Sequence, residues 1–264
     1  MIRLIAIDLD DTLLGNNLTI SVANHTAVKK AMERGIHVVL ATARGWYSTS
    51  QFYRKLHLNS FAVCGSGTKI YNHMGQCVKT WTIPLETAKT ILKIAEQEDI
   101  MVMCSVPEKN YFNFVREDWR SRIRPKVDIE VPGLADQLNE APTQLFVKGE
   151  REINRLLELL PKETPEYRIH TLLYRDGIPE MMIIHPDANK ATGLSWVCEN
   201  LGVKREEVMA LGDSSNDIPM LRFAGIGVAM GWATEPVKEA ADFVTERNDL
   251  DGVATAIHRF VFDS

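Results

Sequence analysis

Hydrophobic and polar positions change their spacing several times along this chain, and the changes mark its elements. Uninterrupted apolar runs, which are typical of strands covered on both faces of a parallel sheet, occupy residues 4–7, 36–41 and 61–64. Helical spacing of apolar residues follows the first two runs, at residues 21–34 and 46–57. This order of strand, helix, strand and helix predicts a parallel sheet with crossover helices.

The pattern differs in the middle of the chain. Residues 68–71 and 77–81 first predict a hairpin. Apolar runs then predict strands at residues 101–106, 111–115, 144–148, 167–173 and 180–185. Helical spacing predicts helices at residues 85–97 and 150–160. Paired strands around two helices indicate an α+β module inserted into the first domain.

Alternation returns after this module. The pattern predicts helices at residues 191–201, at residues 218–223 and after Asp249, with strands at residues 207–211 and 226–229. We therefore expect an α/β fold with a Rossmann-like, doubly wound and mainly parallel sheet. Its core comprises residues 1–83 and 186–264, and residues 84–185 form the inserted α+β domain.

Composition excludes several classes of function. Among 264 residues, 30 basic and 35 acidic side chains give a net charge of -5, so nothing favours nucleic acid or an anionic membrane as a partner. The four cysteines lack any close pair, which argues against a disulfide framework or a zinc site. The start of the chain lacks a cleavage-site pattern, and no apolar run approaches the roughly 20 residues that span a bilayer. We expect a cytoplasmic protein.

Candidate chemistry begins where the first apolar run ends, in Asp8, Asp10 and Asp11. Asp8 and Asp10 point to the same side if the chain stays extended for one more step. Two such carboxylates both stay ionised if a cation or dense hydrogen bonding compensates them, and Mg²⁺ with a substrate phosphate suits this need. Acidic residues that cap a turn are the alternative interpretation.

A second acid-rich strand end follows residue 211. It reads Gly212-Asp213-Ser214-Ser215-Asn216-Asp217, and Asp213 and Asp217 can converge on the same cation as Asp8. A helix N-cap is the alternative here. Thr42 also stands at a strand end, where its hydroxyl and the Ala43 amide could hold phosphate oxygens. Lys190, just before a helix, could add a positive charge.

Together these stretches resemble the four motifs of the haloacid-dehalogenase-like phosphatases. The matching residues are Asp8-x-Asp10-x-Thr12, Thr42, Lys190 and the segment from Gly212 to Asp217. The size and position of the insertion resemble those in the Cof-type branch, whose inserted domain is a class IIB cap. We expect this cap to close over the core. Where that branch often has Asn-Gly-Ala, this chain reads Ser66-Gly67-Thr68. The difference concerns a substrate contact that the asparagine would make. It does not concern the core chemistry.

The resemblance implies a mechanism. Asp8 attacks phosphorus to form an aspartyl-phosphate, and Asp10 protonates the leaving oxygen and later deprotonates water. Mg²⁺ is held by the Asp8 side chain, the Asp10 carbonyl and Asp213, with Asp217 nearby. The residues implied around the transferring phosphate are Leu9, Thr42, Ala43, Lys190 and Asn216. The expected partner is a small phosphate ester.

Two other functions stay open on the residues alone. A phosphomutase needs the same nucleophile and acid, and a non-catalytic phosphometabolite-binding protein keeps the pocket without turnover. Asp10 favours an enzyme over a binding protein. The basic stretch of the module could meet a second anionic group or form a solvated face; it contains Arg116, Arg120, Arg122, Arg124 and Lys126. The sequence does not specify the substrate or the oligomeric state.

Overall fold

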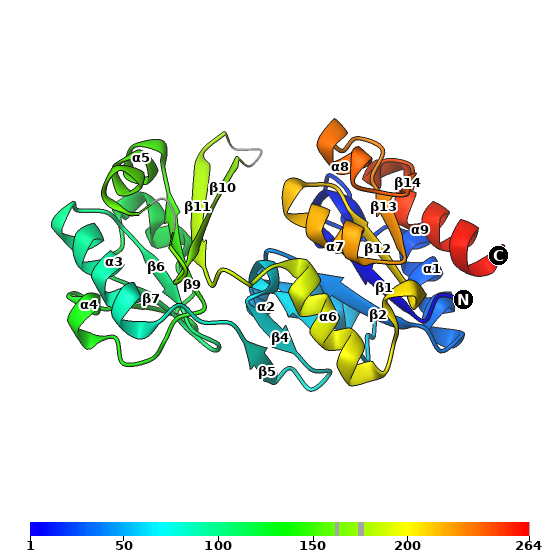
Figure 1. The fold of residues 1–264 in the computed structure, drawn as a ribbon, viewed down its shortest axis with the longest axis horizontal. Coiled ribbons are helices and arrows are strands. Elements are labelled where there is room, and N and C mark those ends of the chain that lie inside the picture. The colour runs from blue at the N-terminus through cyan, green and yellow to red at the C-terminus, as the bar shows by residue number, and fades with distance from the viewer. Residues whose placement is uncertain (162–163, 174–176, 264) are drawn as a thin grey trace. The chain divides into compact units, whose positions relative to one another are not determined.

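The computed structural model describes residues 1–161, 164–173 and 177–263, and these form two compact units (Figure 1). The first unit combines Met1–Lys79 with Ala188–Ser264, and the second is Thr80–Asp187. The second unit is therefore an insertion, since the chain leaves the first unit and later returns to it. The two units have separate hydrophobic cores.

A mostly parallel sheet forms the centre of the first unit. Within the described residues it has eight strands in the order β14-β13-β12-β1-β2-β3-β4-β5. Their bounds are β1 Leu4–Ile7, β2 His37–Ala41, β3 Ala62–Cys64, β4 Lys69–Tyr71, β5 Cys77–Thr80, β12 Val208–Gly212, β13 Ile226–Ala229 and β14 Phe243–Val244. All pairings from β14 to β3 are parallel, and β4 runs antiparallel to β3.

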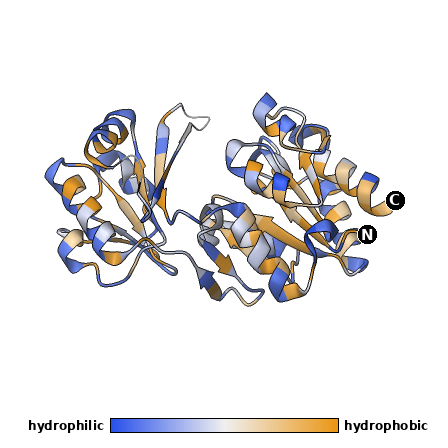
Figure 2. Cartoon of the chain, viewed as in Figure 1, coloured by the Kyte–Doolittle hydropathy of each residue, from blue (hydrophilic) through white to orange (hydrophobic). Residues whose placement is uncertain are grey.

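Helices cover both faces of this sheet. Their bounds are α1 Val22–Glu33, α2 Trp46–Lys55, α6 Lys190–Leu201, α7 Ile218–Phe223, α8 Glu235–Glu239 and α9 Gly252–Ile257. Figure 1 shows α6 and α7 on one face and α1 and α9 on the other. All four residues of β1 are buried, and the strands are among the most hydrophobic parts of the unit (Figure 2). Burial on both faces explains why the strands read as continuous apolar runs.

Local signals in the sequence explain where α1 begins and ends. The Ser21 hydroxyl accepts a hydrogen bond from the Asn24 amide at 3.1 Å, which caps the first turn of the helix. Gly35 follows the last turn with a φ of 79°, a conformation that costs glycine little. The inner face of α1 buries Ala27, Val28 and Ala31 against the sheet. The helix therefore returns the chain to the sheet beside β1, where β2 begins.

In its described residues, the second unit is a mixed sheet with three α-helices. The described strand order is β10-β11-β9-β6-β7-β8, and β7 and β8 alone among the described pairs run parallel. The bounds are β6 Met103–Ser105, β7 Asn110–Phe112, β8 Asp128–Glu130, β9 Gln144–Lys148, β10 Arg168–Leu173, β11 Pro179–Ile184, α3 Leu85–Gln97, α4 Leu134–Gln137 and α5 Glu150–Leu159. Helices α3 and α5 pack their apolar faces on this sheet.

The predicted fold class is confirmed, since a mostly parallel α/β sheet accompanies a separate mixed-sheet unit. The prediction missed four short elements: β8, α4, α8 and β14. Each has five residues or fewer, which is too short for periodic spacing of apolar residues to develop. Short 3-10 helices were also missed, at Gly65–Gly67, Glu117–Arg122, Arg205–Glu207, Ser215–Asp217 and Asn248–Leu250.

Two further observations concern the cysteines and the helices. All four cysteines are present as thiols, and Cys64, Cys104 and Cys198 are buried. Across the described residues, every helix is too short or too polar to cross a lipid bilayer.

Candidate active site

Strand register brings two acidic segments to one edge of the core sheet. Ile7, the last residue of β1, pairs with Leu211 of β12, and the Asp8 amide donates a hydrogen bond to the Leu211 carbonyl at 3.0 Å. Asp8 and Asp213 therefore leave neighbouring parallel strands at their carboxyl ends. Ligands of open α/β sheets bind at this edge.

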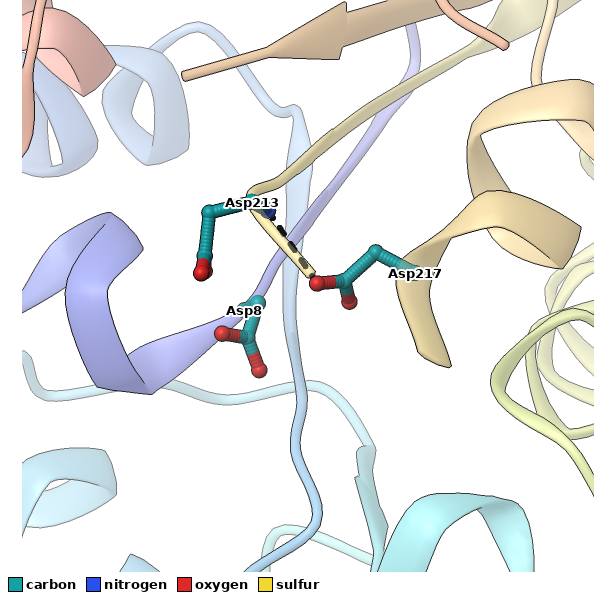
Figure 3. A group of neighbouring side chains, drawn as sticks. All are labelled: Asp8, Asp213 and Asp217. Atoms are coloured by element: carbon teal, nitrogen blue, oxygen red, sulfur yellow. Dashed lines mark hydrogen bonds between the residues drawn. The ribbon is translucent and has the colours of Figure 1, made fainter. Parts of the chain in front are cut away.

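The carboxylates of Asp8, Asp213 and Asp217 converge from separate segments (Figure 3). One oxygen of each lies within 4.8 Å of the others. The exposed fractions of these residues are 5%, 5% and 0%, so water screens their charges poorly. The predicted convergence of Asp213 and Asp217 on Asp8 is therefore present in the structure.

Lys190 supplies a buried positive charge within this group. Its Nζ atom lies 2.6 Å from Asp8 Oδ1 and 2.6 Å from Asp217 Oδ1, and the residue is 1% exposed. The two carboxylates raise the pKa of Lys190 despite its burial, so the ammonium keeps its proton. Lys190 is thus a fixed cation between two acids.

The backbone before Lys190 is held from two sides. Asn189 caps α6, because its side chain accepts a hydrogen bond from the Thr192 amide at 2.9 Å. Gly67 packs against Asn189 so closely that a Cβ atom would lie 2.1 Å from the Asn189 carbonyl oxygen. The Ser66-Gly67-Thr68 loop therefore helps to place Lys190, and its glycine is required by contact as well as by a φ of 97°.

Asp217 is bonded through both carboxylate oxygens. Oδ1 accepts the Lys190 bond, and Oδ2 accepts hydrogen bonds from the Asp213 and Ser214 amides at 3.1 and 3.0 Å. Gly212 allows this approach, since a Cβ atom there would lie 2.5 Å from Asp217 Cβ. Asp217 therefore anchors the segment that carries Asp213.

The charges in this group fit a divalent cation. Three carboxylates and one ammonium sum to -2, from Asp8, Asp213, Asp217 and Lys190. Thr12 donates to Asp213 Oδ1 at 2.7 Å and Lys190 to Asp8 Oδ1, while the described residues supply no hydrogen bond to the second oxygen of either aspartate. Carboxylate oxygens that the protein leaves without donors are available to a cation, and hard cations prefer oxygen ligands.

The pKa values point to the same deficit of positive charge. Burial raises the pKa of Asp8 well above its usual range, and the Lys190 charge offsets this in part. Burial and the Asp217 charge raise the pKa of Asp213 to about 7. A bound cation favours the ionised form of both groups. The structure therefore contains a buried aspartate group whose chemistry suits a metal ion.

Stability should depend on pH through Asp213. Its pKa in the folded state, about 7, exceeds the usual 3.8, so the folded state binds the extra proton between these values. Without metal, this group makes the fold lose stability as pH rises through that window, and the loss persists above it. We expect Mg²⁺ to raise the melting temperature more at about pH 8 than at about pH 5, because protons compete with the ion.

Thermal unfolding with and without Mg²⁺ at both pH values checks this. Asp213→Asn should remove most of the Mg²⁺ effect and raise the melting temperature of the metal-free protein at about pH 8 by a few degrees. An equal Mg²⁺ effect at both pH values, retained in Asp213→Asn, would refute the proposed site.

Asp10 lies outside the convergent aspartate group. Asp10 has extended backbone angles, with φ and ψ of -70° and 129°, and the chain turns at Asp11, which has a positive φ of 59°. The Asp10 carboxylate instead binds the Arg44 guanidinium through two hydrogen bonds of 2.7 and 2.5 Å. A separate positively charged side chain binds each acid, Lys190 for Asp8 and Arg44 for Asp10. These two pairs offset the predicted repulsion between the two carboxylates.

The other predicted phosphate-binding residues lie along the same loops. Thr42 follows β2, beside β1, and is 1% exposed. Its hydroxyl accepts a hydrogen bond from the Arg44 amide at 3.1 Å, which folds the Ala43 turn. Leu9 follows Asp8 and is buried, and Asn216 is half-buried where its side chain accepts a bond from the Ser214 hydroxyl. Their proposed role in holding phosphate remains a prediction.

The haloacid dehalogenase-like hydrolase family matches residues 5–257 of the chain, which includes all of these segments. The protein belongs to the haloacid dehalogenase-like hydrolases. The 5-amino-6-(5-phospho-D-ribitylamino)uracil phosphatase YcsE of Bacillus subtilis is 33% identical over 265 residues, which cover 98% of this chain and 96% of that protein.

Solved structures of haloacid dehalogenase-like hydrolases agree with this membership. One from Bacteroides thetaiotaomicron has a TM-score of 0.85 at 28% identity and covers 98% of this chain and 99% of its own. A subclass IIB sugar phosphatase has a TM-score of 0.79 at 25% identity, with 98% of both chains covered. The predicted family, its Cof-type subclass IIB branch and the phosphatase class are confirmed.

The basic stretch of the second unit is largely ion-paired in this haloacid dehalogenase-like hydrolase. Arg116 pairs with Asp118 and Glu152, and Arg120 pairs with Glu117. Arg124 binds Asp128 through both carboxylate oxygens. These contacts favour the solvated, structural interpretation of the stretch over a second anion site.

Two residues of the site make contacts that the sequence did not predict. Thr12 holds Asp213 through its hydroxyl, although it is part of the first motif. Arg44 binds Asp10, and its position two residues after Thr42 was the feature of the sequence that could have placed it in the site. Both contacts join segments far apart along the chain, which local spacing does not reveal.

Proposed function

We propose that this protein is a Mg²⁺-dependent phosphatase that hydrolyses small phosphorylated metabolites, sugar phosphates or similar phosphomonoesters, through an aspartyl-phosphate on Asp8. One observation carries the proposal. Asp8, Asp213, Asp217 and Lys190 form a buried group of net charge -2 at the ligand-binding edge of the sheet, with donor-free oxygens on two carboxylates.

Asp8 is the nucleophile in this proposal. Lys190 donates a hydrogen bond to Oδ1 of Asp8 at 2.6 Å and partly offsets the effect of burial, so it favours the carboxylate that attacks phosphorus through Oδ2. Asp8, Asp213 and the Asp10 carbonyl would hold Mg²⁺, with Asp217 adjoining, and the ion would shield the attacking carboxylate from the negative phosphate. Forming an aspartyl-phosphate divides one difficult displacement into two easier ones.

Asp10 is the proposed acid and base. In the first step its carboxyl gives a proton to the leaving oxygen, and in the second step its carboxylate takes a proton from the attacking water. Its environment differs from that of Asp8: the side chain of Asp10 is 37% exposed, whereas that of Asp8 is 7% exposed. Different surroundings allow two nearby carboxyls to take different roles.

The remaining loops would surround the transferring phosphoryl group, whose oxygens carry most of its charge. Lys190 contributes charge, Thr42 its hydroxyl, and Asn216 its side-chain amide. The backbone amides of Leu9 and Ala43 complete the proposed set. Residues 84–185, which lie within the second unit, would serve as the class IIB cap that selects the ester.

Similarity to a phosphatase of a phosphorylated ribitylaminouracil and to a sugar phosphatase supports a small phosphate ester as the substrate. A survey of phosphorylated metabolites with purified protein and Mg²⁺, ranked by kcat/KM, tests this. We expect free phosphate without a bisphosphate activator. Isomerised sugar phosphate, formed when a bisphosphate is added, would instead indicate a phosphomutase. Binding without any product would indicate a sensor.

A further inference from the structure

The contact between Arg44 and Asp10 is the feature that the proposed chemistry leaves unexplained. Nε of Arg44 lies 2.7 Å from Asp10 Oδ2, and Nη2 lies 2.5 Å from Asp10 Oδ1. This two-point pairing fixes the plane of the carboxylate as well as its position. The exposed fractions are 23% for the Arg44 side chain and 37% for that of Asp10, so the pair lies at the edge of the buried site.

The backbone of Arg44 is tied at both ends. Its amide donates to the Thr42 hydroxyl at 3.1 Å, and its carbonyl accepts from the Gly65 amide at 2.9 Å. The guanidinium also lies over the Phe52 ring, 5.4 Å from the ring centre. The guanidinium is thereby aimed from the Thr42 loop at the Asp10 loop. These contacts hold the Arg44 guanidinium in a fixed position and orientation.

Asp10, in contrast, has little local support. It stands beside a turn where Asp11 adopts a positive φ, and it lies beyond the end of strand β1. Within the described part of the chain, the hydrogen bonds to its carboxylate come from Arg44. The orientation of this carboxyl group therefore depends on Arg44.

We propose that Arg44 is a positioning residue that orients the Asp10 carboxyl group toward the leaving oxygen of the substrate. The inference rests on the proposed function. As an Asp8 oxygen bonds to phosphorus, the ester P–O bond breaks and the Asp10 proton moves to the leaving oxygen. Water then attacks the aspartyl-phosphate and gives a proton to Asp10, which releases phosphate and restores both carboxyl groups.

Substrates with different leaving groups distinguish a residue that orients the catalytic acid from a residue that only supports the fold. An alkoxide leaves poorly without a proton, so an alkyl phosphate depends on a well-aimed acid. p-Nitrophenolate is stable as an anion and needs little protonation. The ratio kcat/KM reports the steps up to leaving-group release, and it is therefore insensitive to the later water attack.

The test compares kcat/KM of Arg44→Gln on two esters: p-nitrophenyl phosphate, and ribose 5-phosphate or the sugar phosphate that ranks first in the survey. We expect a fall of about 30-fold for the alkyl ester and less than about threefold for the nitrophenyl ester. Arg44→Lys keeps the charge but loses the two-point fork, so its loss for the alkyl ester should be intermediate.

Two controls interpret the result. In an Asp10→Asn background, Arg44→Gln should add no further difference between the esters, since its effect passes through Asp10. Arg54→Gln on α2 is the matched arginine; Arg54 bonds the Ser50 hydroxyl, and its loss should leave both esters within about twofold. Melting temperatures identify variants that fold poorly.

Equal losses of kcat/KM for both esters, or none, in Arg44→Gln would overturn the inference if Asp10→Asn alone discriminates between them. The proposed function would then stand. If Asp10→Asn itself shows no discrimination, the acid role proposed for Asp10 is wrong, and the role of Arg44 falls with it.

Discussion

Replacing Asp8 by Asn removes phosphate release and leaves the protein folded. The amide oxygen is a much weaker nucleophile than a carboxylate, so we expect turnover to fall by at least about 10⁴-fold. The fold should tolerate the change, because burial disfavours the ionised form of Asp8 and Lys190 keeps its contact with Asp217. Phosphate release and thermal unfolding measure the two effects.

Asp242→Asn is the matched control for this experiment. Asp242 precedes β14, at the opposite edge of the parallel sheet, and accepts a hydrogen bond from the Gly227 amide at 2.8 Å. An asparagine oxygen can accept the same bond. We expect activity within about twofold of the unaltered protein. Normal turnover in Asp8→Asn would show that another group attacks phosphorus.

The second large effect concerns stability. Lys190→Met leaves two buried carboxylates, those of Asp8 and Asp217, without their shared cation. Removing one partner of a buried ion pair typically lowers the free energy of unfolding by about 3–5 kcal/mol. We expect a loss of this size in denaturant titrations without Mg²⁺. A further Asp217→Asn substitution should restore part of it, since one uncompensated charge is removed.

Lys148→Met provides a comparison in the second unit. Lys148 is also buried, with Nζ 2.7 Å from Glu180, but the Glu180 side chain is 17% exposed, whereas that of Asp217 is 0% exposed. Water can solvate Glu180 once its partner is gone, so the loss of stability should be smaller. A loss in Lys190→Met no larger than in Lys148→Met would mean that Lys190 does not hold the buried acids.

The sequence predicted most of the core because burial leaves a clear signal. Continuous apolar runs located β1, β2 and β12, and the acids after them had to share the carboxyl edge of the sheet. The two-residue β14 carries no such signal, and neither does the three-residue β8. Pairing with a neighbouring strand, β13 for β14 and β7 for β8, forms these strands, and local pattern does not.

Side-chain partners were less predictable than strand ends. A lone lysine is usually solvated, yet Lys190 is buried because two acids from distant segments meet at its ammonium group. The place of Asp10 depended on the backbone turn at Asp11, which spacing alone does not give. Gly212 makes room for Asp217, a contact that spacing along the chain does not reveal.

Trapping the phosphorylated enzyme tests the central claim most directly. Asp10→Asn slows water attack, so an acid quench during turnover of p-nitrophenyl phosphate with Mg²⁺ should capture the aspartyl-phosphate. Mass spectrometry of the peptides is expected to find one added phosphoryl group on Asp8, and none when Asp8→Asn is combined with Asp10→Asn. A phosphoryl group on another residue, or nitrophenol release without Asp8, would contradict the account.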